Sequence, residues 1–172
     1  IPLYAVGGVP NSVMVRKDDD RFPNFKAFIE YMRKHPGELR YTSGAYGNLP
    51  HIDLASMMKA TDTVAQNVPY AELEEGVKDL RGGIIDFMSG NPGFYRANKS
   101  HVKILAVFSE LDSVSEIFDN APKISDFGIE FPLTSLAPMG WSWLVVKKGT
   151  PPEAVEKLRA AMKVVLVRDD VK

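Results

Sequence analysis

The stretch LRYTSGAYGNLPH, residues 39–51, contains the signals for a short strand, a glycine-spaced loop and the start of a helix. Gly44 and Gly47 allow positive φ angles, which let a loop backbone approach a ligand closely. Asn48 can cap a helix that carries Pro50 in its first turn, where the missing N–H of proline does no harm. Because the amides of a first helical turn favour negative charge, this stretch predicts a site for a carboxylate or phosphate. The same residues also suit an ordinary strand-to-helix turn.

Strand-like and helical segments alternate outward from this stretch. Toward the N-terminus, residues 12–17 are apolar and β-branched, and Asn24 can cap a helix with apolar residues at helical spacing. Toward the C-terminus the predicted order is a strand over 63–68, a helix from Glu72 to Leu80, and strands over 84–88 and 102–108. This succession predicts an α/β fold with a largely parallel sheet flanked by helices.

A second loop, SGNPG at residues 89–93, repeats the chemistry of the first. Asn91 can cap a short helix that opens with Pro92, directly after a predicted strand. In parallel sheets, ligands bind beyond the carboxyl ends of the strands. We therefore expect the two loops to converge there.

The pattern is weaker beyond residue 108. Residues 109–136 have no strong period, whereas residues 141–146 predict a strand. Thr150 can then cap a last helix that has Pro151 at its first position. The chain begins without Met, and both of its ends fall inside predicted elements, so we expect a fragment of a longer protein from which an upstream segment has been removed.

The composition indicates a globular protein. Of the 172 residues, 45% are apolar and 25% charged, and the formal net charge of −1 offers no field for a nucleic acid partner or an acidic membrane surface. No apolar run approaches the roughly 20 residues of a membrane span, so direct membrane insertion is not expected. The chain has no cysteine, which excludes disulfides and thiolate sites.

Motifs for metals, cofactors and catalysis are missing or weak. The three histidines are far apart, and no P-loop or G-x-G-x-x-G occurs, so neither a metal nor a cofactor is expected. Ser43 and His51 leave open a small hydrolase-like α/β enzyme acting on an anionic substrate, although Ser43 is not in a G-x-S-x-G elbow. Tyr46 and Tyr70 are either ligand-facing or half-buried. A third interpretation, an interaction domain without a pocket, predicts that the Ser43 and Asn91 loops lie apart.

Several short motifs come in a characteristic order. They are VPN at 9–11, HPGEL at 35–39, the loop from Ser43 to His51, VPY at 68–70, LRGGIID at 80–86, Asn91 and GTP at 149–151. Over essentially its whole length the chain resembles the extracytoplasmic solute receptors of tripartite tricarboxylate transporters, the Bug family.

The resemblance implies a type II periplasmic binding protein, in which two α/β domains close on a small carboxylate for delivery to a membrane permease. Backbone amides, hydroxyls and water would hold the ligand, without catalysis. Residues 18–134 would be the complete second domain, 1–17 a first-domain remnant and hinge strand, and 135–172 the return hinge strand and a first-domain helix. The glycine-rich turn of the first domain is absent, so we expect this chain to bind ligand weakly or not at all.

The resemblance also implies which residues contact the ligand, on the matching binding loop, the VPY motif and two cleft positions. They are Ser43, Gly44, Ala45, Tyr46, Gly47, Asn48, His51, Tyr70, Asn91 and Trp141. The chain departs from the family pattern where Ala71-Glu72 replaces Lys-Gly, Gly90 replaces an Asp, and Ser142-Trp143 replaces an aromatic-glycine pair. Glu72 would oppose a second carboxylate, which leaves open an unusual or mono-anionic ligand.

Overall fold

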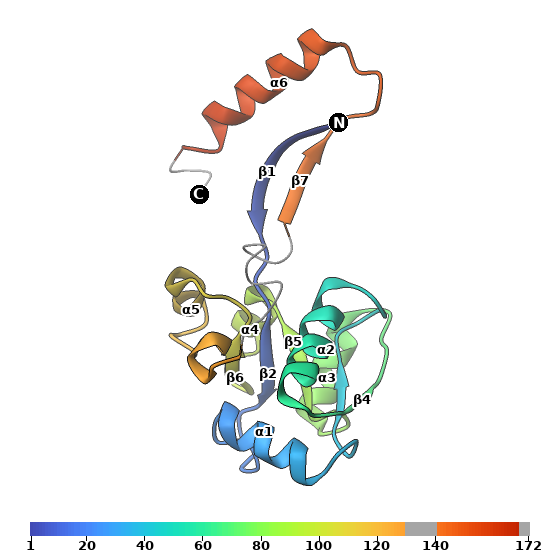
Figure 1. The fold of residues 1–172 in the computed structure, drawn as a ribbon, viewed down its shortest axis with the longest axis vertical. Coiled ribbons are helices and arrows are strands. Elements are labelled where there is room, and N and C mark those ends of the chain that lie inside the picture. Colours follow the sequence, from blue (N-terminus) through green and yellow to red (C-terminus); the bar gives the residue numbers. More distant parts are fainter. Residues whose placement is uncertain (130–140, 169–172) are drawn as a thin grey trace. The chain divides into compact units, whose positions relative to one another are not determined.

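The computed structural model describes residues 1–129 and 141–168, which belong to two compact units (Figure 1). Unit 1 consists of Ile1–Val9 and Gly140–Lys172, and unit 2 of Pro10–Met139. The elements of unit 2 are β2 (Ser12–Arg16), α1 (Phe25–Lys34), β3 (Arg40–Thr42), α2 (Leu49–Thr61), β4 (Gln66–Asn67), α3 (Leu73–Gly82), β5 (Phe87–Gly90), α4 (Pro92–Asn98), β6 (Val102–Val107), α5 (Asp112–Ile117) and the 3-10 helix η1 (Ile124–Phe127). Those of unit 1 are β1 (Pro2–Gly8), β7 (Trp141–Val145) and α6 (Pro152–Val165). Both glycine-containing loops therefore lie in unit 2.

Unit 2 is built on a five-stranded sheet in the order β4-β3-β5-β2-β6. β3 pairs in parallel with β4 and with β5, whereas β2 pairs antiparallel with both β5 and β6. The predicted α/β sheet with flanking helices is confirmed, and β2 is the strand that breaks its parallel order.

The position of β2 also decides where unit 2 begins. β2 lies between β5 and β6, so its residues are an integral part of the sheet and unit 2 starts at Pro10. The resemblance instead predicts this boundary after residue 17, and the apolar pattern of residues 12–17 does not reveal which strands they pair with. The second expected boundary, between residues 134 and 135, falls outside the described residues.

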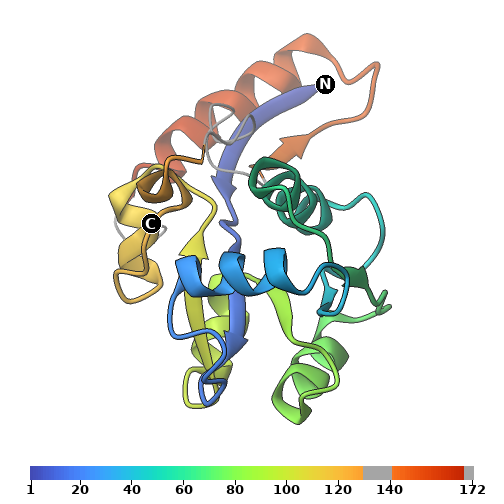
Figure 2. The same cartoon turned by 60° about the horizontal axis from the view of Figure 1, so that its bottom comes forward.

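Helices cover both faces of the sheet, which gives three layers. Successive side chains of a strand point to opposite faces, and in β2 Val13 and Val15 belong to one core while Met14 belongs to the other. The first core also contains side chains of α1 and α2, and the second contains side chains of α3, α4 and α5. Figure 2 shows α1 lying across one face of the sheet.

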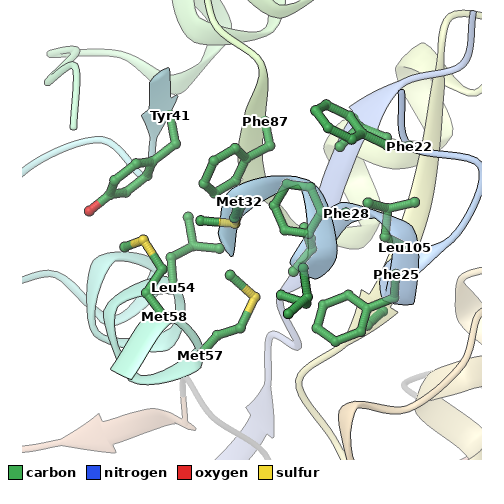
Figure 3. Close-up of a cluster of buried hydrophobic side chains, with 14 of the residues drawn as sticks. Phe22, Phe25, Phe28, Met32, Tyr41, Leu54, Met57, Met58, Phe87 and Leu105 are labelled. Atoms are coloured by element: carbon green, nitrogen blue, oxygen red, sulfur yellow. The ribbon is translucent and has the colours of Figure 1, made fainter. Parts of the chain in front are cut away.

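The core beneath α1 and α2 is rich in aromatic and methionine side chains (Figure 3). Phe28 of α1 stands edge-on to Phe22, with ring centroids 5.2 Å apart, and to Phe87 of β5 at 5.0 Å. Tyr41 of β3 stacks on Phe87 at 5.2 Å, and Met57 of α2 is fully buried in the same cluster. This packing fixes α2 against the sheet and therefore fixes where its first turn lies.

Three helices begin with the asparagine caps that the sequence predicts. The side-chain oxygens of Asn24, Asn48 and Asn91 accept the backbone N–H three residues further on, at 2.9, 2.9 and 3.0 Å. The prediction for Thr150 is wrong, because its hydroxyl donates to Lys147 O at 2.8 Å and the next helix, α6, starts at Pro152. α5 and η1 occupy the region without a strong period, since helices this short carry too few turns to show one.

Unit 1 consists of an antiparallel strand pair and one helix. β1 pairs with β7, and the Arg159 guanidinium of α6 donates to Pro2 O of β1 at 2.9 Å. Val155 of α6 is buried, whereas Val145 of β7 and Val164 of α6 are both 66% exposed. Among the described residues, no helix has the length and apolar character needed to cross a membrane.

We predict that Phe28→Ala lowers the free energy of unfolding by about 4 kcal/mol, because it leaves a cavity among several rings of the α1 and α2 core. Urea unfolding followed by circular dichroism measures the change. Lys26→Ala, on the exposed side of the same helix, is the control and should cost less than about 0.5 kcal/mol. A loss below about 1 kcal/mol for Phe28→Ala would contradict the packing described above.

Candidate functional site

The two glycine-containing loops meet at one end of the sheet. β3 and β5 are parallel neighbours with Thr42 opposite Met88, so the loops that follow them start side by side. β2 starts at the same end, where the Ser12 hydroxyl donates to Gly90 O at 2.8 Å. The predicted convergence is confirmed, and the prediction of the third interpretation, that these loops lie apart, is wrong.

The first loop is shaped by its glycines and by Asn48. Gly44 and Gly47 have φ angles of +83° and +77°, a region in which other residues are strained. Asn48 caps α2 with its side-chain oxygen and donates its amide nitrogen to Ser43 O at 2.9 Å. A single side chain therefore closes the loop and starts the helix.

Several backbone amides of this loop already have partners within it. The N–H of Gly44 donates to the Thr42 hydroxyl at 3.2 Å, and that of Gly47 donates to His51 Nδ1 at 3.0 Å. The N–H of Asn48 donates to Ala45 O at 3.4 Å. These three amides are therefore not available to a ligand. Those without a hydrogen-bond partner among the described residues are the amides of Ala45, Tyr46 and Leu49.

Exposure divides the expected loop residues into two groups. Ser43 and Gly44 are buried, and no described residue hydrogen-bonds to the Ser43 hydroxyl. Ala45, Tyr46 and Gly47 are exposed, and the ring of Tyr46 stands edge-on to that of His51 with centroids 5.2 Å apart. A ligand in solvent can reach the second group, while the first group supports the loop from below.

The hydrogen bond from Gly47 leaves Nε2 of His51 as a hydrogen-bond donor. Because His51 Nδ1 accepts the Gly47 N–H, the neutral ring carries its proton on Nε2. Nε2 has no hydrogen-bond partner among the described residues, and the ring is half-buried. An Nε2–H group at the start of α2 suits an oxygen of an anionic ligand.

The hydrolase-like alternative requires the Ser43 hydroxyl within hydrogen-bond reach of a histidine nitrogen. The structure does not form this pair, since the Ser43 hydroxyl is buried without a partner among the described residues. Within residues 1–129 and 141–168, no group of three or more His, Asp or Glu side chains could hold a metal ion. The site therefore consists of hydrogen-bond donors, and its described residues do not form a serine–histidine pair.

Asn91 lies directly after β5, at the sheet end where the Ser43–Asn48 loop begins, whereas the Tyr70 hydroxyl points away from this loop. Asn91 caps α4 through its side-chain oxygen, which leaves its amide nitrogen without a partner among the described residues. The Tyr70 hydroxyl donates to Asp79 at 2.5 Å, and burial together with this bond raises the pKa of Tyr70 to about 12. The start of α3 lies near the loop, since Leu73 is against Gly44. Asp79 is six residues further along α3, roughly 9 Å down the helix axis, so the Tyr70 hydroxyl that binds it points away from the loop.

Trp141 is the first residue of β7 and belongs to unit 1. Its contribution to a site formed with residues of unit 2 stays a prediction.

Asp53 is a buried acid beneath the loop that the sequence analysis did not select as a site residue. It lies on α2 with no exposed surface, and its Oδ2 accepts from the Asn11 amide nitrogen at 2.7 Å. Burial raises the pKa of Asp53 to about 6, and the hydrogen bond from Asn11 opposes this rise only in part. The sequence signals for this contact were the VPN motif, which contains Asn11, and an acidic residue near the start of a predicted helix. Neither signal reveals the pairing, because Asn11 and Asp53 are 42 positions apart in the chain.

Four buried side-chain oxygens at this end of the sheet have no hydrogen-bond partner among the described residues. They are Ser43 Oγ, Asp53 Oδ1, Asn67 Oδ1 and Ser89 Oγ. Buried polar atoms without partners are rare, and they usually mark a bound water or a functional position. The floor of the loop is therefore polar and retains unused hydrogen-bonding capacity.

Comparison with known proteins identifies the family. Residues 3–170 match the family described as the tripartite tricarboxylate transporter family receptor, TctC. The chain belongs to this receptor family. The sequence-based resemblance to these receptors is confirmed, and the solved TctC relative from Polaromonas below is described as a solute-binding protein and not as an enzyme.

Curated relatives of this receptor include two bacterial proteins. The UPF0065 protein of the tcbD-tcbE intergenic region of a Pseudomonas species is 27% identical over 173 residues, which cover 99% of this chain and 50% of the relative. Protein BugT of Bordetella pertussis is 24% identical over 157 residues, which cover 90% of this chain and 46% of the relative. The chain thus spans about half the length of the curated relatives it matches.

Solved structures share the fold of this receptor. A TctC solute-binding protein from Polaromonas, without ligand, superposes with a TM-score of 0.78 at 26% identity, covering 99% of this chain and 57% of the other. MatC from Rhodopseudomonas palustris, with bound malate, gives a TM-score of 0.75 at 20% identity, covering 99% of this chain and 56% of the other. The expected periplasmic binding protein fold is confirmed, with about half of each neighbour matched.

We predict that Asp53→Asn stabilises the receptor more at high pH than at low pH. Because the pKa of Asp53 is about 6 in the folded state against an ordinary value of 3.8, the ionised carboxylate costs stability above pH 6. This cost disappears as the pH falls through 6 toward 3.8. The gain in unfolding free energy from Asp53→Asn should be about 2 kcal/mol larger at pH 8 than at pH 4.

Urea unfolding of both proteins at the two pH values measures this difference. Asp20→Asn, on an exposed turn, controls for the loss of one acidic side chain. An equal effect of Asp53→Asn at pH 4 and pH 8 would contradict the buried, ionisable state of Asp53.

Proposed function

We propose that this chain is part of a periplasmic receptor that captures a small organic carboxylate at the end of the sheet where β3 and β5 finish, and delivers it to a membrane permease. The observation that carries the proposal is the convergence of two asparagine-capped loops at one sheet end in a member of the TctC receptor family. The neighbour MatC has malate bound, which supports a small carboxylate as the ligand class.

The accessible groups at this sheet end are suited to a carboxylate. The amides of Ala45 and Tyr46, the Nε2–H of His51 and the amide nitrogen of Asn91 are donors without partners among the described residues. α2, with 13 residues, directs the positive end of its dipole to the same place. The ligand oxygens would replace water on these donors, without an arginine.

The receptor would enclose its ligand between two lobes. We place the wall formed by the Ser43–Asn48 loop and Asn91 on the lobe that contains unit 2. Since the chain spans about half the length of its curated relatives, the rest of the enclosing wall would come from the other half of the fold. We propose that residues 1–172 alone bind the ligand weakly.

The negative charge of Glu72 affects which carboxylic acid the receptor would prefer. It is the exposed residue before α3, and the next residue, Leu73, lies against Gly44 of the binding loop. A carboxylate at this position repels a second negative charge on the ligand. The receptor would therefore favour an acid whose far end is neutral.

Isothermal titration calorimetry on the full-length gene product that contains residues 1–172 tests this function. Malate, succinate, citrate and propionate are suitable probes. We predict that Asn91→Asp weakens the binding of the best of these acids at least about tenfold while the melting temperature stays the same, because Asp caps α4 equally well but replaces a donor with a negative charge.

Asn24→Asp, at the cap of α1, is the matched control, since it makes the same change of residue and charge at another helix start. It should leave the affinity unchanged. An equal effect of the two substitutions, or no binding of any of these acids by the unmodified gene product, would contradict the proposal.

For Glu72, we predict that Glu72→Gln increases the affinity for succinate relative to propionate by roughly threefold, because an exposed like charge is removed near the second carboxylate. The ratio of the two dissociation constants, measured by the same calorimetry, reports the effect. An unchanged ratio would show that Glu72 does not face the ligand.

A further inference from the structure

A second concave surface lies at the opposite end of the same sheet. It is a groove of about 750 Å³ where β2 ends, lined by Arg16, Lys17, Asp18, Lys78, Arg81 and His101 among others. We call it the basic groove. β2 spans five residues, so the basic groove is roughly 13 Å or more along the strand from the carboxylate site. All of its lining residues belong to unit 2.

The charges of the basic groove are unbalanced. Four side chains on its wall are cationic and one is a carboxylate, in a chain whose net charge is −1. Lys17, Lys78 and Arg81 are exposed, and no ion pair joins them to a carboxylate within the described residues. The positive charge is therefore available to a ligand.

Among the four cationic side chains of the basic groove, Arg16 is held in place by ion pairs. Its guanidinium pairs with Asp18 and with Asp19, both at 3.3 Å, and its side chain is 26% exposed. Gly83 makes room for it, since a Cβ at residue 83 would lie 2.3 Å from Arg16 Nη1. Asp19 is buried and is also bound by Arg21 at 2.7 Å, so its charge is directed away from the groove.

The surroundings argue against a compact anion such as phosphate. α3 ends at Gly82 and α4 ends just before Ser100, and both of these residues line the groove. Helix C-termini present carbonyl oxygens and the negative end of the dipole, which repel a dense anion placed among them. The cations are instead separate side chains, two at the end of β2 and two on α3, which suits several negative charges spaced apart.

The spacing of two cations matches an extended acidic chain. Lys78 and Arg81 are three residues apart on α3, so they share one face with about 5–6 Å between their Cβ atoms. Alternate residues of an extended peptide are about 6.6–7 Å apart on one side. Two carboxylates at such positions can each pair with one of these cations.

We propose that the basic groove binds an acidic segment of a partner protein, with two or more Asp or Glu carboxylates on an extended chain. Main-chain N–H groups of the segment can also donate to the carbonyl oxygens at the ends of α3 and α4. This site is separate from the carboxylate site, so it does not depend on the proposed function.

The test is a titration of the ¹⁵N-labelled chain, residues 1–172, followed by amide chemical shifts. The probe is a seven-residue peptide of alternating glutamate and serine with blocked ends, and its glutamine counterpart is the uncharged control. Shifts should concentrate at residues 16–18, 78–82 and 100–101 and not at the Ser43–Asn48 loop. The double variant K78E/R81E should raise the dissociation constant roughly tenfold or more, since two attractions become repulsions.

K34E/K59E, which reverses two exposed lysines on α1 and α2, makes the same change in net charge and should leave the affinity within about twofold. Equal weakening by both double variants, shifts centred on the carboxylate site, or no shifts at all would overturn the proposal. Inorganic pyrophosphate binding at the groove more tightly than the peptide would also overturn it, in favour of a compact anion.

Discussion

The candidate site depends on the antiparallel pairing of β2 in the middle of the sheet. β2 is hydrogen-bonded to β5 on one side and to β6 on the other, and its first residue, Ser12, holds the end of β5 through Gly90 O. Asn11, directly before it, binds the buried Asp53 of α2. The segment that arrives from unit 1 therefore fixes both the loop after β5 and the first turns of α2. Loss of this pairing would free the end of β5 and remove the contact that holds the first turns of α2.

The two ends of the sheet attract negative charge through different groups. At the end with the glycine-containing loops, the accessible donors are mainly backbone amides and neutral side chains at the starts of helices. At the other end, helices finish and the charge comes from lysine and arginine side chains. Converging neutral donors suit one small carboxylate, whereas dispersed cations suit a longer acidic chain. The two surfaces therefore select ligands of different size, although both bind negative charge.

Local chemistry could be predicted from the sequence and long-range pairing could not. The caps at Asn24, Asn48 and Asn91 involve residues three positions apart, and all three predictions are confirmed. The antiparallel direction of β2 and the burial of Asp53 depend on partners far along the chain, which no local pattern contains. The convergence of the two loops could be predicted, because alternating strands and helices favour parallel strands that finish at one edge of a sheet.

The central claim is that a small acid binds to the accessible donors of the two loops. The most direct measurement is a crystal structure of the full-length gene product with whichever of malate, succinate and propionate binds most tightly. We expect a ligand carboxylate within hydrogen-bond distance of the amides of Ala45 and Tyr46 and of the Asn91 side chain. A ligand bound elsewhere in the crystal, with these donors still facing solvent, would contradict it.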